Sequence, residues 1–488
     1  MKSIKIINKI KNKYISMPIT MKAALWFTIC GFIQKGMGFI TVPIFTRILS
    51  TQQYGIVSVF YSWESIFVIF CTLNLYSGVF NNGMVKFEND RNGFTSSMQG
   101  LVIVLTSIVS MIYILFHGVL SQALELQSLL MIMMFFEIIF NASFSLWSSK
   151  ERFEYKYKKM VLITILITIL SPLVSAIAVF NAPPNYGADT KIISSAIVGI
   201  IIYGYIFIEN FIKGKKFFNK IYWKYALKFN LPLIPHYLST LLLAQSDRIM
   251  ISKLIGMAEA GIYGLSHNLA MILNILTTSV NNTFAPWLYM KLKEKKYDNI
   301  ANVSNKLFAV IAIALGLLIG ISPEVIRILA PVDYYNAVYV IPPLAISLYF
   351  MFMYQIFANV EFYYEKNKFI ALASVMSALF NIILNYFFVK HYGYIAAGYT
   401  TLFCYIILGL SHYIFSKKII KNYIGENVIL FELKSILLIG LILIIFGIIM
   451  IGLYKILILR YLILLAICIF SIAKRNFIIT IIKNARKD

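Results

Sequence analysis

Residues 247–268 read DRIMISKLIGMAEAGIYGLSHN and form the turn between two long apolar segments. Arg-Ile stands near the end of the first segment, a short polar turn follows, and Gly-Ile opens the second. The stretch TRILSTQQYGIVSVFYS at residues 46–62 has the same order of features. The match predicts an internal repeat whose two copies have the same orientation. Such parallel repeats recur in transporters whose two helix bundles move about a central site.

The chain around this turn is unusually apolar. Of its 488 residues, 60% are hydrophobic and 13% are charged, whereas a soluble chain has about 45–50% apolar and about 25% charged residues. The composition predicts an all-α polytopic membrane protein. The net charge of +24 would suggest nucleic acid as the partner of a soluble protein. Here the positions of the charges favour the membrane surface instead, and we expect no nucleic-acid partner.

Fourteen segments are long and apolar enough to cross a bilayer, since a helix needs about 20 mostly apolar residues to do so. Their predicted spans are 24–46, 56–80, 97–116, 125–147, 160–180, 192–211, 229–252, 261–289, 307–321, 338–363, 369–389, 394–415, 429–450 and 456–473.

The lysines and arginines set the predicted orientation. If the N-terminus is cytoplasmic, 34 of the 44 basic residues lie in cytoplasmic connections and 6 in outer ones. This bias is what the positive-inside rule requires. It predicts a multi-pass membrane protein with both termini on the cytoplasmic side.

The helix order predicts four parts. Residues 1–22 form a basic segment with no signal-peptide core, either a short helix on the inner leaflet or a disordered tail. Residues 23–215 form an N-terminal bundle of six helices, and residues 216–416 form a second bundle of six. Residues 417–488 add two helices and a basic C-terminal tail.

Lys35 lies near the middle of the first predicted span, on the same face as Thr28, Gly31 and Gly38. An ionised group at this depth costs about 2.5–3.5 kcal/mol, so it usually faces a bundle interior or water. Lys35 is therefore a candidate for a cavity site that binds an anion. The alternative is a lysine whose side chain reaches to the membrane interface.

Two acids also fall within predicted spans. Glu64 lies in the second span and Glu137 in the fourth, with Asn141 and Ser148 on the same side as Glu137. Each acid is a candidate to pair with Lys35 or to bind a coupling proton. A structural hydrogen bond between helices explains them equally well.

The seventh span carries a continuous polar stripe. Pro232 and Pro235 predict a kink near its start. At 100° per residue, His236 and Asp247 share one face, and Arg248 lies on the adjoining flank. Adjacent residues point about 100° apart, so we expect Asp247 to meet a cation elsewhere in the bundle. We expect Arg248 to meet an acid or the substrate, and the alternative is that the two residues only fix this helix to its neighbours.

Uncharged polar residues mark three of the later predicted helices. Contacts between asparagines of neighbouring helices are their ordinary explanation, and contact with a sugar is the alternative. These residues are His267, Asn274 and Asn281 at steps of seven, Asn359, and the pair Asn381 and Asn385.

No motif for catalysis or for a cofactor is present. The five histidines lack metal-ligand spacing, and no HExxH motif or phosphate-binding glycine loop occurs. The four cysteines lie in apolar stretches without CxxC spacing, so we interpret them as buried hydrophobic side chains. The sequence therefore predicts no enzyme, no cofactor and no metal site.

Two longer stretches resemble a known group of membrane proteins. GFIQKGMGFITVPIFTRILSTQQYGIVSVF at residues 31–60 resembles the first hairpin of bacterial polysaccharide repeat-unit flippases of the Wzx type. SDRIMISKLIGMAEAGIYGLSHNLA at residues 246–270, followed by NNTFAPWLYMKLKE at residues 281–294, is similar to the region of their seventh and eighth helices. These flippases belong to the multidrug/oligosaccharidyl-lipid/polysaccharide exporter superfamily.

The resemblance implies two six-helix bundles that form a V around a cavity. It implies a substrate, undecaprenyl-diphosphate-linked oligosaccharide, that alternating access moves to the outer leaflet for O-antigen, capsule or exopolysaccharide. Lys35, Arg47 and Arg248 are the cations that match the cavity role, while Asp247, Glu64 and Glu137 are candidates for binding H⁺ or Na⁺. A polysaccharide polymerase and other assembly proteins are possible partners. The alternatives are a multidrug or cation antiporter of the same superfamily and, less favoured, a membrane polysaccharide polymerase.

Overall fold

The computed structural model describes residue 14 and residues 16–473, and these residues form two compact units of α-helices. Unit 1 holds residues up to 49 and residues 60–234, and unit 2 holds residues 50–59 and the residues from 235 on. Helix α3 therefore begins in unit 2 and continues in unit 1. Of the predicted basic segments, residues 1–13, residue 15 and the tail 474–488 lie outside the described residues.

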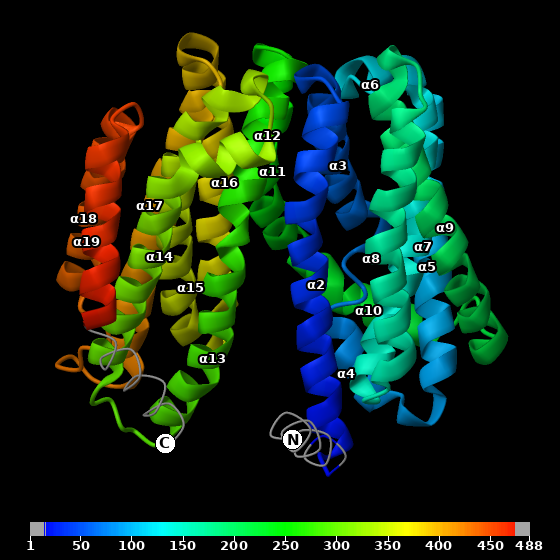
Figure 1. Cartoon of the computed structure of the whole chain (residues 1–488). Helices are drawn as coiled ribbons and strands as arrows, with labels where there is room; N and C mark the ends of the chain where they lie inside the picture. The colour runs from blue at the N-terminus through cyan, green and yellow to red at the C-terminus, as the bar shows by residue number, and fades with distance from the viewer. Residues whose placement is uncertain (1–13, 15, 474–488) are drawn as a thin grey trace, which may run out of the picture. The chain divides into compact units, whose positions relative to one another are not determined.

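Unit 1 is built from long apolar helices joined by short turns (Figure 1). Helix α9 packs on α5, α7 and α8, and α2 packs on α8. A cluster of buried aromatic and aliphatic side chains, including Phe80, Phe94 and Tyr222, joins α4, α5 and α10. The elements are α2 (Ile19–Ile48), α3 (Thr51–Thr72), α4 (Gly78–Lys86), η1 (Glu88–Asp90), α5 (Arg91–Leu115), α6 (His117–Leu124), α7 (Ser128–Phe153), α8 (Tyr157–Phe180), η2 (Pro184–Tyr186), α9 (Gly187–Gly214), α10 (Lys220–Asn230) and η3 (Leu231–Leu233).

Unit 2 is organised around α15, which is apolar on every side. A helix that is hydrophobic all round is buried in the core of its fold, and α15 packs on α12, α13, α14, α16, α17 and α18. The elements are α11 (Ile234–Leu254), α12 (Met257–Ile272), α13 (Asn274–Lys293), α14 (Ile300–Leu329), η4 (Val332–Tyr339), α15 (Ile341–Tyr363), α16 (Asn367–Tyr392), α17 (Ile395–Tyr423), α18 (Leu433–Leu453) and α19 (Leu457–Ala473).

The last two helices belong to unit 2. Helix α18 packs on α14 and α15, and α19 packs on α14 and α18, as the orange and red helices show in Figure 1. The buried Arg460 side chain of α19 forms an ion pair with Glu324 of α14. The predicted division at residues 215–216, and the separation of residues 417–488 as a part of their own, stay predictions.

All fourteen predicted spans coincide with helices, and the all-α membrane fold is confirmed. Among the described residues, eleven helices are long and apolar enough to cross a membrane. The other three spans are α11, which is rich in polar residues, the broken span of α12 and α13, and the short α19.

Three predicted boundaries differ from the structure. The first helix of the span 56–80 ends at Thr72, because Leu73 and Asn74 have positive φ and interrupt the helix before α4. The span 261–289 is two helices, and at the break Leu273 N–H donates to the Ala270 carbonyl, three residues back. The span 307–321 is only the apolar middle of the 30-residue helix α14.

Candidate functional site

Helix α11 brings an acid and a base into the interior of unit 2. Asp247 is 1% exposed and Arg248 is 7% exposed. Ser246 and Ser252 of the same helix are also buried. Buried charges require partners that satisfy them, so the contacts of these two residues define the site.

Both carboxylate oxygens of Asp247 accept hydrogen bonds from neighbouring helices. Oδ2 accepts from the Tyr263 hydroxyl of α12 and from Thr401 Oγ1 of α17 at 2.7 Å. Oδ1 accepts from Asn385 Nδ2 of α16 at 2.6 Å. Asp247 therefore joins four helices through neutral donors, and the prediction that a cation elsewhere in the bundle answers it is wrong among the described residues.

A second layer of polar groups holds these donors in place. Asn381 Nδ2 donates to Thr401 Oγ1 at 3.1 Å, and its Oδ1 accepts from Ser246 Oγ at 2.9 Å. The Thr400 hydroxyl donates to Asn385 Oδ1. We call Asp247, Tyr263, Asn381, Asn385, Thr400 and Thr401 the Asp247 network.

Arg248 points to a different set of partners, as the 100° step along a helix predicts. Its Nη2 contacts His267 Nδ1 at 2.5 Å and Asn268 Oδ1 at 3.3 Å, and its Nη1 donates to Gln245 Oε1 at 3.1 Å. A guanidinium has no acceptor, so His267 Nδ1 accepts the hydrogen bond. The predicted acid partner is absent from these contacts, since an imidazole and two amides take its place.

Unit 1 contains a separate charged cluster. Glu64 of α3 and Glu137 of α7 both interact electrostatically with Lys191 of α9. Lys191 Nζ lies 3.4 Å from the Tyr61 hydroxyl, 4.5 Å from the centre of its ring and 5.3 Å from that of Phe45. Lys191 stands just before the predicted span 192–211. It is the cation beside the two acids in the structure, whereas pairing with Lys35 was one of their two predicted roles.

The remaining predicted site residues lie elsewhere. Lys35 belongs to α2, but its side chain lies outside the described residues. Arg47 is exposed in the last turn of α2, where Nη1 donates to the Pro43 carbonyl at 2.8 Å. His236 lies in the first turn of α11, three turns before the Asp247 network, so the predicted stripe does not bring it to Asp247.

One buried acid–base pair was not predicted. His412 Nδ1 of α17 lies 2.7 Å from Glu361 Oε1 of α15, and neither side chain is exposed. A single histidine in an apolar segment and an acid at the end of another were the available signals. Nothing in the sequence indicates that the two meet.

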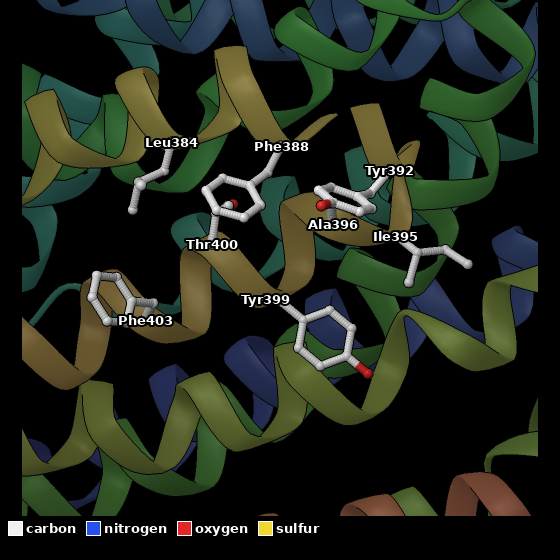
Figure 2. Close-up of a pocket in the computed structure, with 8 residues that line it drawn as sticks. All are labelled: Leu384, Phe388, Tyr392, Ile395, Ala396, Tyr399, Thr400 and Phe403. Atoms are coloured by element: carbon white, nitrogen blue, oxygen red, sulfur yellow. The ribbon is translucent and has the colours of Figure 1, made fainter. Parts of the chain in front are cut away.

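An apolar groove lies beside the Asp247 network. Residues of α16 and α17 line a volume of about 660 Å³, and the rings of Phe388, Tyr392, Tyr399 and Phe403 surround it (Figure 2). Thr400 also lines the groove. Because its hydroxyl donates to Asn385, one wall of the groove belongs to the network.

Comparison with known proteins identifies the family. Residues 20–290 match the family described as "Polysaccharide biosynthesis protein". The chain belongs to this family. A similar member of the curated proteins is Lsg locus putative protein 1 of Haemophilus influenzae, which is 24% identical over 358 residues, covering 71% of this chain and 85% of that protein.

Solved structures show the same fold as this polysaccharide biosynthesis protein. The lipid II flippase MurJ, in an inward closed conformation, matches with a TM-score of 0.64 and 16% identity, covering 93% of this chain and all of that one. An inward-facing multidrug resistance MATE family transporter of the MOP superfamily matches with a TM-score of 0.62 and 11% identity, covering 82% and 98%. At these identities the two matches show that the chain has the predicted fold.

Proposed function

We propose that this chain is a flippase that moves undecaprenyl-diphosphate-linked oligosaccharide from the cytoplasmic to the outer leaflet of a bacterial membrane by alternating access. One observation carries the proposal: this member of a polysaccharide biosynthesis family has the fold of a lipid flippase and buries charged side chains inside one unit. The diphosphate–sugar headgroup cannot cross about 30 Å of hydrocarbon without a polar path. The polymer served is O-antigen, capsule or exopolysaccharide.

In this proposal a monovalent cation, H⁺ or Na⁺, binds at the Asp247 network, and its movement down a gradient drives the transport cycle. Asp247, Asn381, Asn385, Thr400 and Thr401 bring oxygen atoms from three helices to one buried place. Carboxylate, amide and hydroxyl oxygens are the ligand type that hard cations take. Asp247 has no ion-pair partner among the described residues, so a bound cation would compensate its buried charge.

We assign the diphosphate and the hydrocarbon chain of the substrate to chemically different surfaces of the protein. Lys35 and Arg47 of α2 are the cations proposed to attract the diphosphate. Arg248 serves the substrate only if it leaves His267 and Asn268, which hold it in this conformation. The apolar groove between α16 and α17 suits the hydrocarbon chain of the substrate, because its lining is almost wholly aliphatic and aromatic.

The location of the lipid-linked intermediate tests the proposal in cells. Deletion of the gene is expected to leave the undecaprenyl-linked repeat unit inaccessible to a membrane-impermeant oxidant added outside, and restoring the chain is expected to expose it. Equal exposure in both strains would contradict the proposal.

A multidrug or cation antiporter is the second candidate, because a MATE family transporter shares the fold. Its cavity would have to attract cations, whereas Lys35, Arg47 and Arg248 favour anions. Efflux of an organic cation that needs this chain and does not need those three residues would favour the antiporter.

A further inference from the structure

The strongest unexplained feature of unit 2 is the buried pair of Glu361 and His412. Neither side chain is exposed, and the His412 Nδ1–Glu361 Oε1 distance is 2.7 Å. Among the described residues, no lysine or arginine makes an ion pair with Glu361. His412 shares α17 with Thr400 and Thr401, but among the described residues no hydrogen bond joins the pair to the Asp247 network.

Three polar atoms at this level lack a hydrogen-bond partner among the described residues. They are Glu361 Oε2, His412 Nε2 and Nδ1 of His236 in α11, and all three are buried. His236 also interacts electrostatically with His412. A buried polar group without a hydrogen-bond partner is unfavourable. A pair that served only to fix α15 to α17 would not need buried polar atoms without hydrogen-bond partners.

The net charge of the Glu361–His412 pair depends on how many protons the pair binds. With one proton, it exists as carboxylic acid and neutral imidazole or as carboxylate and imidazolium, and both forms have zero net charge. Without that proton, a bare carboxylate remains among apolar side chains, where an uncompensated charge is strongly unfavourable. Burial therefore retains one proton, and access to water releases it.

Among the described residues, His412 is the charged group that acts on Glu361. The Tyr354 ring of α15 lies 5.2 Å from the His412 ring, and the Tyr413 ring of α17 meets the Phe357 ring of α15 edge to face. His236 of α11 is a titratable group that interacts electrostatically with His412. The charge of the pair is thus set by its own proton and by the protonation of His236.

The position of the pair along the helices connects it with the Asp247 network. On α11, Asp247 follows His236 by eleven residues, and on α17, His412 follows Thr401 by eleven residues. Asp247 bonds to Thr401, and His236 interacts with His412. The two helices therefore run antiparallel with two polar levels about 16 Å apart, given a rise of 1.5 Å per residue.

We propose that Glu361 and His412 form a proton-binding site, separate from the Asp247 network, with His236 as the group through which the proton exchanges. Release of this proton accompanies the step of the cycle that opens α15 and α17 to water. That last role rests on the proposed function, whereas the existence of the site does not.

Infrared difference spectroscopy during a pH titration tests the site in the full-length protein in lipid. The wild type is expected to give a carboxyl C=O band from an apolar environment. Glu361→Gln is expected to lose this band, and it keeps the hydrogen bond to His412, so the helix contact survives. Glu365→Gln, at an exposed acid four residues later, is the matched control and should keep the band. An identical spectrum in wild type and Glu361→Gln would overturn the proposal.

Transport in vesicles under an imposed pH gradient tests the coupling. Glu361→Gln and His412→Gln are expected to lose the response to the gradient while Glu365→Gln retains it. An unchanged response in both variants would overturn the coupling role. If the wild type moves no lipid-linked oligosaccharide, the proposed function fails, and the infrared band still decides whether the proton site exists.

Discussion

Gly55 of α3 and Gly261 of α12 lie so close that neither position has room for a Cβ atom. A Cβ on Gly55 would meet the Met257 carbonyl and the Gly261 nitrogen, and one on Gly261 would meet the Thr51 carbonyl and the Gly55 nitrogen. These glycines hold corresponding places in the two similar stretches from which the internal repeat was predicted. Small residues allow helix backbones to approach closely in membranes. The two glycines therefore allow the backbones of α3 and α12 to come into contact.

Substitution at this contact is expected to weaken the fold. Gly55→Val and Gly261→Val force backbone atoms apart and should lower the free energy of unfolding by about 1–3 kcal/mol. Thermal unfolding in detergent measures the change. Gly452→Val is the control, because no atom lies within 4 Å of its Cβ position. Equal melting temperatures for all three variants would contradict the close approach.

Asp247→Asn is expected to remove cation dependence without unfolding the protein. The amide keeps the shape of the side chain and removes a buried charge. Transport should become insensitive to Na⁺ and pH gradients, whereas Asp333→Asn, at an exposed acid, should behave as wild type. A variant that keeps its full response to both ions would exclude Asp247 as the coupling site.

Arg248→Lys is expected to destabilise unit 2 despite conserving the charge. An ammonium cannot reproduce the planar fork that reaches His267, Asn268 and Gln245 together. At least one buried acceptor is then left unsatisfied, at about 1–3 kcal/mol. Thermal unfolding checks this value. A Lys variant as stable as wild type would show that the observed contacts contribute little.

Lys191→Met is expected to lower the stability of the protein more than removal of all three charges of the cluster Glu64, Glu137 and Lys191. The single change leaves Glu64 and Glu137, which are half-buried, without the cation with which both interact, and a carboxylate without a compensating charge is unfavourable in apolar surroundings. Adding Glu64→Gln and Glu137→Gln should recover most of the stability. A triple variant less stable than Lys191→Met would contradict the electrostatic interpretation.

The sequence could predict the helices because hydrocarbon thickness and apolar run length are local properties. It could also predict that Asp247 and Arg248 point to different neighbours, because the helix step fixes their directions. It could not predict the neighbours themselves, since Asn385 and Thr401 lie 138 and 154 residues from Asp247.

The burial of charged residues near helix ends could not be predicted either. Lys191 stands one residue before the predicted span 192–211, whereas α9 begins at Gly187 and carries Lys191 in its interior. Glu361 lies near the end of α15, where an acid is usually solvated, and its burial depends on His412, 51 residues later. Helix ends are set by packing as well as by hydropathy, and packing is a property of the folded chain.

Reconstitution of the full-length protein with undecaprenyl-diphosphate-linked oligosaccharide measures the central claim most directly. In protein-free vesicles, a membrane-impermeant glycosidase reaches only the sugar in the outer leaflet. With the protein, the glycosidase is expected to cleave the inner-leaflet sugar as well when an ion gradient is imposed, and Asp247→Asn should abolish this gain. The same cleaved fraction with and without the protein would contradict the account.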